Sequence, residues 1–288
     1  KTVDECFDML LSRLSASSSE TTSAASHRAS IEASLKSGFG MTSLFRSGSF
    51  GHQTSVRWYS DVDYFAVIPR ANLKKNSTQS LQAIRSTLHA RFPRTGVTVR
   101  SPAVIVPFGS QPGERHEIVP ADYVRQSTGG FNIYDIPDRA GGWMRSSPQG
   151  HNAWVNMHNN NLNKKLKPLI RLIKAWNYYN TVGIRSFYLE LRTTEYAKNE
   201  SVIIYKIDFL SCLRAIRRSE LASMQDPMGV SGLVAPATAA IKTSAISKLD
   251  TAIRRAEKAR EEENANNMPM AIFWWNLVFN DWFPKWDA

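Results

Sequence analysis

The chain has 288 residues, of which 42% are hydrophobic and 21% are charged, and its formal net charge at pH 7 is +11. This length suffices for one large domain or for two lobes with a sizeable core, and the composition excludes a globally disordered protein. The longest apolar-rich stretch, residues 270–279, is too short for a bilayer span, and the two cysteines, Cys6 and Cys212, are too few for a disulfide framework or a zinc site.

The N-terminal part is predicted to be helical. Apolar residues recur at helical spacing over residues 3–14 and again over residues 31–35. The Ser/Thr/Ala-rich stretch between them is either a linker or part of a long exposed helix that bridges two lobes, and its alanines and periodic polar residues favour the helix. The chain starts at Lys1 without an initiator Met and without the pattern of a signal peptide, so we expect a trimmed cytoplasmic protein.

The next segment indicates a site for phosphate and metal. Strands are predicted at residues 42–45 and 61–68. Between them, Gly48 and Ser49 offer a tight turn whose backbone N–H groups and hydroxyl can hold a phosphate at a helix N-terminus. Asp61 and Asp63 are two residues apart in a strand, so both carboxylates point to the same face, roughly 6 to 7 Å apart at Cα. This pattern is suited to divalent metal ions and predicts binding of a nucleoside triphosphate with Mg²⁺.

The first half of the chain is predicted to be α+β, with a helix at residues 77–91 and strands at 96–100, 103–107 and 115–119. A third carboxylate from a neighbouring strand would close the metal site and let two ions stabilise the attacking and leaving oxygens. The candidate is Glu117, on a strand that we expect to end at Pro120, and Asp122 is the reserve choice. Considered alone, Glu117 is more typical of a solvated strand residue, but its context favours the metal site.

From residue 139 onwards the sequence is rich in helical patterns. Helices are predicted at residues 187–196, 201–219, 238–263 and 268–280, with a break at 229–232. Residues 139–189 contain eight Lys or Arg residues and no acidic one. A polyanion should be attracted there, and charge alone does not choose between nucleic acid and a triphosphate.

One helix in this basic stretch carries an apolar and a basic stripe. Its apolar residues recur at steps of four and three, at Leu162, Leu166, Leu169, Ile173 and Trp176. Lys167, Arg171 and Lys174 repeat on roughly the opposite face, which we expect to be available to a ligand. Pro168 marks the start of the helix or a bend in it. For Lys174, a solvated face and phosphate binding both fit the pattern.

Three of these segments resemble the polymerase-β-type nucleotidyltransferase signature: Gly48-Ser49, Asp61-Val-Asp63 and Glu117-Ile-Val-Pro-Ala121. Further segments resemble the second half of bacterial cGAS/DncV-like nucleotidyltransferases (CD-NTases). They are Ile136-Pro-Asp138, Gly142-Trp143, Ser147-Pro148, His151, Leu172-Ile-Lys-Ala-Trp-Asn177, Ser186-Phe-Tyr-Leu-Glu190, Trp275, Phe279 and Phe283-Pro284. Each motif by itself is weak, but their order and spacing cover nearly the whole chain.

The resemblance implies a bilobal α+β fold. Residues 1–138 would form a catalytic lobe with a polymerase-β-like mixed sheet and a long N-terminal helix. Residues 139–288 would form a helical bundle lobe that completes the nucleotide pocket. The implied enzyme condenses nucleoside triphosphates into a cyclic oligonucleotide, which serves as a second messenger in anti-phage (CBASS) signalling. A cyclic dinucleotide is the expected product. ATP is the expected substrate with GTP or UTP as alternatives, a regulatory protein partner is allowed, and neither nucleic acid nor a membrane is required.

The resemblance also implies roles for single residues. Gly48 and Ser49 would hold the triphosphate, and Lys174 and Ser186 would contact phosphates. Phe187 is the candidate for stacking on a base. The catalytic and metal-binding residues would be Asp61, Asp63 and Glu117, with Mg²⁺ or alternatively Mn²⁺ as the ion. Glu stands at the third position where Asp is common in the family, and its extra methylene shifts the carboxylate outward.

Two other functions compete with the cyclic-oligonucleotide synthase. The same catalytic core could add nucleotides to an RNA 3′ end, although the segments at residues 143–151 and 174–177 resemble the signalling family. A non-enzymatic nucleic-acid-binding module is motivated by the net charge of +11. It would not depend on Asp61. We predict that the product contains adenine and that its ring is a dinucleotide.

Overall fold

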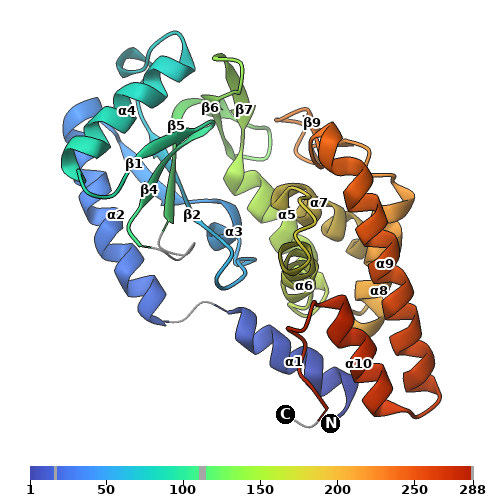
Figure 1. Cartoon of the computed structure of the whole chain (residues 1–288). Coiled ribbons are helices and arrows are strands. Elements are labelled where there is room, and N and C mark those ends of the chain that lie inside the picture. Colours follow the sequence, from blue (N-terminus) through green and yellow to red (C-terminus); the bar gives the residue numbers. More distant parts are fainter. Residues whose placement is uncertain (16–17, 110–114, 287–288) are drawn as a thin grey trace. The chain divides into compact units, whose positions relative to one another are not determined.

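The computed structural model describes residues 1–15, 18–109 and 115–286, and contacts divide the chain into two compact units (Figure 1). The sheet unit comprises Ala16–Ala153 with Met228–Gly232. The helical unit comprises Lys1–Ser15, Trp154–Pro227 and Leu233–Ala288. This division differs from the boundary predicted at residue 138, because residues 139–153 group with the sheet and the first helix groups with the helical unit.

The described part of the sheet unit contains a seven-stranded mixed sheet. Its strands are β1 Ser43–Arg46, β2 Val62–Val67, β3 Thr98–Arg100, β4 Ala103–Pro107, β5 Arg115–Gln126, β6 Asn132–Pro137 and β7 Trp143–Ser146. Five of them lie in the order β1-β2-β5-β4-β3, and β6 pairs with both β5 and β7. β2 and β5 run parallel to each other, whereas the remaining pairs of this sheet are antiparallel.

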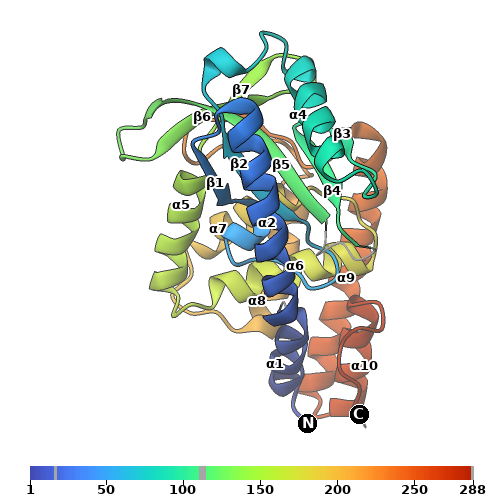
Figure 2. The ribbon, with the colours of Figure 1, turned by 90° about the vertical axis from the view of Figure 1, so that its left-hand side faces the viewer.

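One face of the sheet is covered by the helices α2 Ser18–Phe39 and α4 Ser77–Arg91. Figure 2 views the sheet unit from the side of α2 and shows this helix in front of the strands. Ile31 of α2 and Ile84 of α4 pack with the even-numbered residues of β2, among them Tyr64. Because side chains alternate along a strand, the odd-numbered Asp63 points to the opposite face.

The helical unit is built mainly from helices that surround an aromatic core. Its helices are α1 Val3–Leu14, the end of α5 Pro148–Asn161, α6 Leu166–Tyr179, α7 Ser186–Ala197, α8 Tyr205–Arg218, α9 Ala239–Asn264 and α10 Met268–Val278. The strands β8 Met224–Gln225 and β9 Leu233–Val234 form a short hairpin.

Phe7 explains why α1 belongs to the helical unit. Its ring is fully buried and lies 4.9 Å from Trp275 and 5.0 Å from Phe283, with edge-to-face geometry in both pairs. Phe209 and Phe279 complete the cluster, with ring centroids 6.5 and 6.2 Å from that of Phe7. This burial gives α1 a large apolar contact with α8, α10 and the segment after α10.

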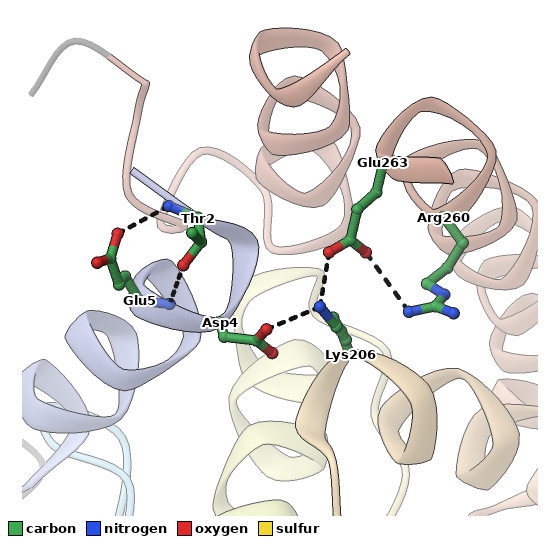
Figure 3. Close-up of polar contacts among 6 residues, drawn as sticks. All are labelled: Thr2, Asp4, Glu5, Lys206, Arg260 and Glu263. Atoms are coloured by element: carbon green, nitrogen blue, oxygen red, sulfur yellow. Dashed lines mark hydrogen bonds and ion pairs between the residues drawn. The ribbon is translucent and has the colours of Figure 1, made fainter. Parts of the chain in front are cut away.

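Polar contacts reinforce the start of α1. Thr2 and Glu5 form a capping box, in which the Thr2 hydroxyl accepts from the Glu5 N–H and the Glu5 carboxylate accepts from the Thr2 N–H. Figure 3 shows Lys206 between Asp4 and Glu263, and its ammonium group donates to both carboxylates at 2.7 Å. These contacts connect the N-terminal turns of α1 and α8 to the C-terminal turn of α9.

Several predicted elements are confirmed. The helices at residues 3–14 and 77–91 and the strand at 103–107 have the predicted bounds, and the Ser-rich stretch is helical from Ser18. The helix expected at 201–219 begins only at Tyr205. The strands β6 and β7 and the helix α5 were not predicted.

The strand with Glu117, predicted to end at Pro120, continues to Gln126. Proline lacks an N–H donor and usually interrupts a sheet. Pro120 is in register with Ala66 of β2, but on its other edge the pairing with β4 ends at Ile118 and the pairing with β6 begins at Asp122. Pro120 therefore removes no hydrogen bond from the ladders with β4 and β6.

Within the described ranges, no helix combines the length and the apolar character that crossing a bilayer requires.

The aromatic cluster generates a prediction for stability. Phe7→Ala should lower the free energy of unfolding by about 3 to 5 kcal/mol, because it leaves a cavity among four other rings. Arg13→Ala, at an exposed position of the same helix, should change it by less than about 1 kcal/mol. Urea denaturation followed by circular dichroism measures both values, and equal effects of the two substitutions would contradict the packing described for α1.

Candidate active site

The turn after β1 lies directly against one of the predicted metal-binding carboxylates. The Ser47 N–H donates to the Asp63 carbonyl at 2.9 Å, which holds the beginning of the short helix α3 Gly48–Gly51 beside β2. Gly48 has a φ of 55°, and a Cβ atom at this position would lie 2.0 Å from Asp63 Oδ2. Glycine is therefore required here for its backbone conformation and for the close approach of the turn to Asp63.

Asp63 and Glu117 are direct neighbours on the parallel strands β2 and β5. The register pairs Asp63 with Glu117, so their side chains leave the same face of the sheet from strands about 4.8 Å apart. Asp61 comes just before β2 and two residues before Asp63, which places it on the same face. The sheet thus brings together the three carboxylates that the sequence analysis selected from two distant segments.

Arg115 is a fourth member of this group. Its guanidinium Nη2 lies 2.6 Å from Asp61 Oδ2 and 4.0 Å from Glu117 Oε1. Arg115 precedes Glu117 by two residues on β5 and shares its face. Sequence reasoning missed Arg115, although its spacing of two residues from Glu117 was a usable signal.

Two atoms of the group lack hydrogen bonds. Asp61 Oδ1 and Arg115 Nε are both buried, and neither has a hydrogen-bond partner in the described part of the chain. Buried polar atoms are rarely left in this state, and an unsatisfied carboxylate oxygen is a natural ligand for a cation. Among the described residues, no group of three or more His, Cys, Asp or Glu side chains is arranged so that it could hold a metal ion.

The donor set nevertheless fits a hard divalent cation. Asp61, Asp63 and Glu117 offer only oxygen atoms, which Mg²⁺ prefers, and one of these oxygens is buried without a partner. The binding of Mg²⁺ or Mn²⁺ by these three residues stays a prediction.

Glu117 has an unusual acidity. Burial, followed by the negative charge of Asp61, raises its pKa from 4.5 to about 7, against the opposing effect of Arg115. In the metal-free protein this carboxyl group therefore gains or loses its proton near neutral pH.

Asp122, the reserve choice for the third carboxylate, lies elsewhere. It follows Glu117 by five residues, so regular alternation puts it on the opposite face of the sheet. It also lies beyond the last residue of β5 that pairs with β2, Ala121, and its in-register neighbour is Asp135 of β6. Glu117 is therefore the carboxylate beside Asp63.

The predicted phosphate and base contacts belong to the helical unit. Ser186 and Phe187 are the first two residues of α7, and both are partly buried. Lys174 of α6 does not lie on a solvated face, because its Nζ atom is 2.6 Å from Glu190 Oε2 of α7 and both side chains are 2% exposed. The roles of Lys174, Ser186 and Phe187 toward a nucleotide stay predictions.

The basic face of α6 was predicted to be available to a ligand, but two of its three basic side chains are not exposed. Lys167 and Lys174 are both buried. The physical reason is that α6 and α7 pack together on this side, with Glu190 as the counter-ion of Lys174. Sequence reasoning noted Glu190 only as part of a motif and missed its pairing with Lys174, which is 16 positions earlier on another helix.

Comparison with known proteins identifies related sequences. The model of the Second Messenger Oligonucleotide or Dinucleotide Synthetase domain matches residues 2–159. A probable cyclic nucleotide synthase of Bacillus cereus is 27% identical over 173 residues, which are 59% of this chain and 51% of that protein. A cyclic AMP-AMP-AMP synthase of an Acinetobacter species is 26% identical over 262 residues, or 84% of this chain and 72% of that protein. The chain thus spans about half the length of the Bacillus relative.

Solved structures show the same fold. CdnC of Escherichia coli MS115-1, determined with ATP, has a TM-score of 0.77 at 16% identity, with 98% of each chain covered. Vibrio cholerae DncV, bound to 3′-deoxy GTP, has a TM-score of 0.74 at 13% identity, with 96% of this chain and 93% of DncV covered. These likenesses confirm the predicted fold class, a polymerase-β-like mixed sheet with a helical C-terminal part.

The raised pKa of Glu117 predicts a pH dependence of stability. A carboxyl group whose pKa is raised on folding stabilises the folded protein below its unfolded pKa of 4.5, and this contribution is lost as the pH rises through about 7. Glu117→Gln mimics the protonated form. In the metal-free protein it should raise the free energy of unfolding at pH 8 by at most about 3 kcal/mol and leave it unchanged near pH 4.5.

Urea denaturation of the two proteins between pH 4.5 and 8.5 measures this difference. A gap between Glu117→Gln and wild type that does not grow with pH would show that Glu117 titrates normally.

Proposed function

The chain belongs to the family of Second Messenger Oligonucleotide or Dinucleotide Synthetase domains and is a bacterial CD-NTase, and from this premise we propose that it condenses nucleoside triphosphates into a cyclic oligonucleotide. The observation that carries the proposal is the in-register pair of Asp63 and Glu117, with Asp61 on the same face and the Gly48 turn against Asp63. Two observations together support a nucleotidyltransferase reaction. The chain belongs to a family of cyclic nucleotide synthases, and its three carboxylates lie on one face of the sheet.

In the proposed reaction a ribose hydroxyl attacks the α-phosphorus of a triphosphate. The new oxygen–phosphorus bond forms as the bond to pyrophosphate breaks, and the proton of the hydroxyl passes to a base. Glu117 is placed for this role, because it lies in register with Asp63 on the neighbouring strand. When bound, Mg²⁺ supplies positive charge that lowers the pKa of the hydroxyl and offsets the charge of the leaving pyrophosphate.

The other residues of the sheet unit hold the substrate and the ion. Backbone N–H groups at Gly48 and Ser49 would donate to the triphosphate, since the first N–H groups of a helix have no partner within it. Asp61 and Asp63 would provide the remaining carboxylate ligands. A second round of the same reaction on the linear intermediate would close the ring.

We propose ATP as a substrate. The Acinetobacter relative is named for a product made of AMP units, and the E. coli structure holds ATP. The name of that relative favours a ring of three nucleotides, whereas the sequence analysis expected a dinucleotide. The mass of the product decides between them.

We also propose that the product signals in anti-phage defence and that a protein partner regulates the enzyme. The E. coli CdnC protein has been solved in a complex with HORMA, and that structure covers 98% of the present chain at a TM-score of 0.76. It motivates a search for a regulatory partner of the present chain.

The proposed activity predicts a specific product. Incubation of the chain with labelled nucleoside triphosphates and Mg²⁺ in the absence of RNA should yield adenine-containing material that resists phosphatase, because a ring has no terminal phosphate. Asp63→Asn should lower the yield by at least about 100-fold, since it removes a charged ligand. Mass spectrometry identifies the ring. Extension of an added RNA 3′ end without cyclic product would instead support the alternative tail-adding activity.

The close approach of Gly48 to Asp63 predicts the effect of one methyl group. Gly48→Ala should lower the rate by about 100-fold or more, because the new Cβ atom would displace the Asp63 carboxylate or the turn that faces it. Gly130→Ala is the matched control, since Gly130 also has a positive φ, 79°, but has nothing within 4 Å of an added Cβ. Initial rates of pyrophosphate release compare them, and equal losses would show that backbone strain alone matters.

A further inference from the structure

Arg115 forms an ion pair inside the carboxylate group. Its Nη2 atom is 2.6 Å from Asp61 Oδ2, and the Arg115 and Asp61 side chains are 38% and 18% exposed. Glu117 Oε1 is 4.0 Å from the same nitrogen. The guanidinium therefore lies close to two of the three residues proposed to hold a cation, and it supplies one positive charge there.

The hydrogen bonding of this guanidinium group is incomplete. Arg115 Nε is buried without a hydrogen-bond partner in the described part of the chain, and so is Asp61 Oδ1. Arginine satisfies a carboxylate best through two parallel N–H donors, and here the contact with Asp61 is made by Nη2. The side chain is long and partly exposed, so it can move into solvent without unfolding the strand that carries it.

The Arg115 guanidinium and a divalent cation would compete for the carboxylates of Asp61 and Glu117. Mg²⁺ binds carboxylate oxygens at 2.0–2.1 Å, and two cations that share one partly buried carboxylate repel each other strongly. Binding of the ion to Asp61 and Glu117 thus opposes the Arg115 ion pair by charge repulsion and favours withdrawal of the Arg115 side chain.

We infer that Arg115 is a resident counter-ion of Asp61 and Glu117 that a divalent cation must displace, and that Arg115 thereby weakens the metal affinity of the nucleotide-free protein. The inference rests on the proposed function, because it takes the three carboxylates as metal ligands. Arg115 is a positioning residue in this scheme. It neutralises the carboxylates until the ion arrives, and it sets how much metal is needed.

The test is the affinity of the nucleotide-free chain for Mn²⁺, measured by electron paramagnetic resonance of the free ion at constant pH and salt. Arg115→Gln should bind Mn²⁺ about tenfold more tightly than wild type, which corresponds to about 1.4 kcal/mol. The matched control is Arg145→Gln. It removes the same charge from the 3.2 Å ion pair of Arg145 with Asp135 in the same unit, where the side chains are 47% and 22% exposed. This control should stay within about twofold of wild type.

Unchanged or weaker Mn²⁺ binding by Arg115→Gln would overturn the inference, and so would an equal gain in Arg145→Gln. If neither wild type nor Arg115→Gln binds Mn²⁺, Arg115 is not the obstacle and the inference also fails. Thermal melting checks the fold of each variant. Should Arg115→Gln not fold, Arg115→Lys, which keeps the charge but loses the planar fork, should bind about threefold more tightly, and no gain would overturn the inference.

Asp63→Asn separates this inference from the proposed function. If it abolishes Mn²⁺ binding while Arg115→Gln has no effect, the metal site stands and only the role of Arg115 is wrong. If Mn²⁺ binding is indifferent to Asp63→Asn, the carboxylates are not the metal site, and both the proposed function and the inference fall.

Discussion

The parallel pairing of β2 with β5 is the constraint on which the candidate site depends. It sets Asp63 directly opposite Glu117, although 54 positions separate them along the chain. Asp61 and Arg115 each precede one of the paired acids by two residues and form an ion pair with each other. The Gly48 turn, which follows β1, lies against Asp63 from the neighbouring strand. A shift of the register by one residue would turn Glu117 to the opposite face of the sheet, where α2 and α4 pack.

Carboxylates that lie close together on one face repel each other when they are charged. Two features of the chain reduce this repulsion. Burial beside Asp61 raises the pKa of Glu117 to about 7, so this carboxyl group can remain neutral at little expense. Arg115 offsets the charge of Asp61 through a close ion pair. The raised pKa of Glu117 and the ion pair of Arg115 with Asp61 therefore stabilise the fold when no ion is bound. Under the proposed function, the same two features affect how tightly the ion binds.

The acidic pair and the glycine turn could be predicted from the sequence, because their evidence is local: Asp61 and Asp63 share a face by alternation, and Gly48 marks a turn. The register that selects Glu117 over Asp122 is set by long-range pairing and could not be predicted from spacing alone. The same holds for Phe7, whose partners Trp275 and Phe283 lie at the other end of the chain. The surroundings of Lys174 were misjudged because its partner, Glu190, comes from the next helix. Local sequence patterns were sufficient to predict helices and strands. They were not sufficient to predict which distant segments contact one another.

In the proposed active site, Asp61, Asp63 and Glu117 together bind the catalytic cation. Anomalous diffraction from crystals grown with Mn²⁺ and a non-hydrolysable ATP analogue tests it most directly. We predict an anomalous peak within about 2.2 Å of a carboxylate oxygen from each of these residues, with Arg115 moved away from Asp61. A Mn²⁺ ion bound elsewhere in the chain, with these carboxylates still paired to Arg115, would contradict the proposed active site.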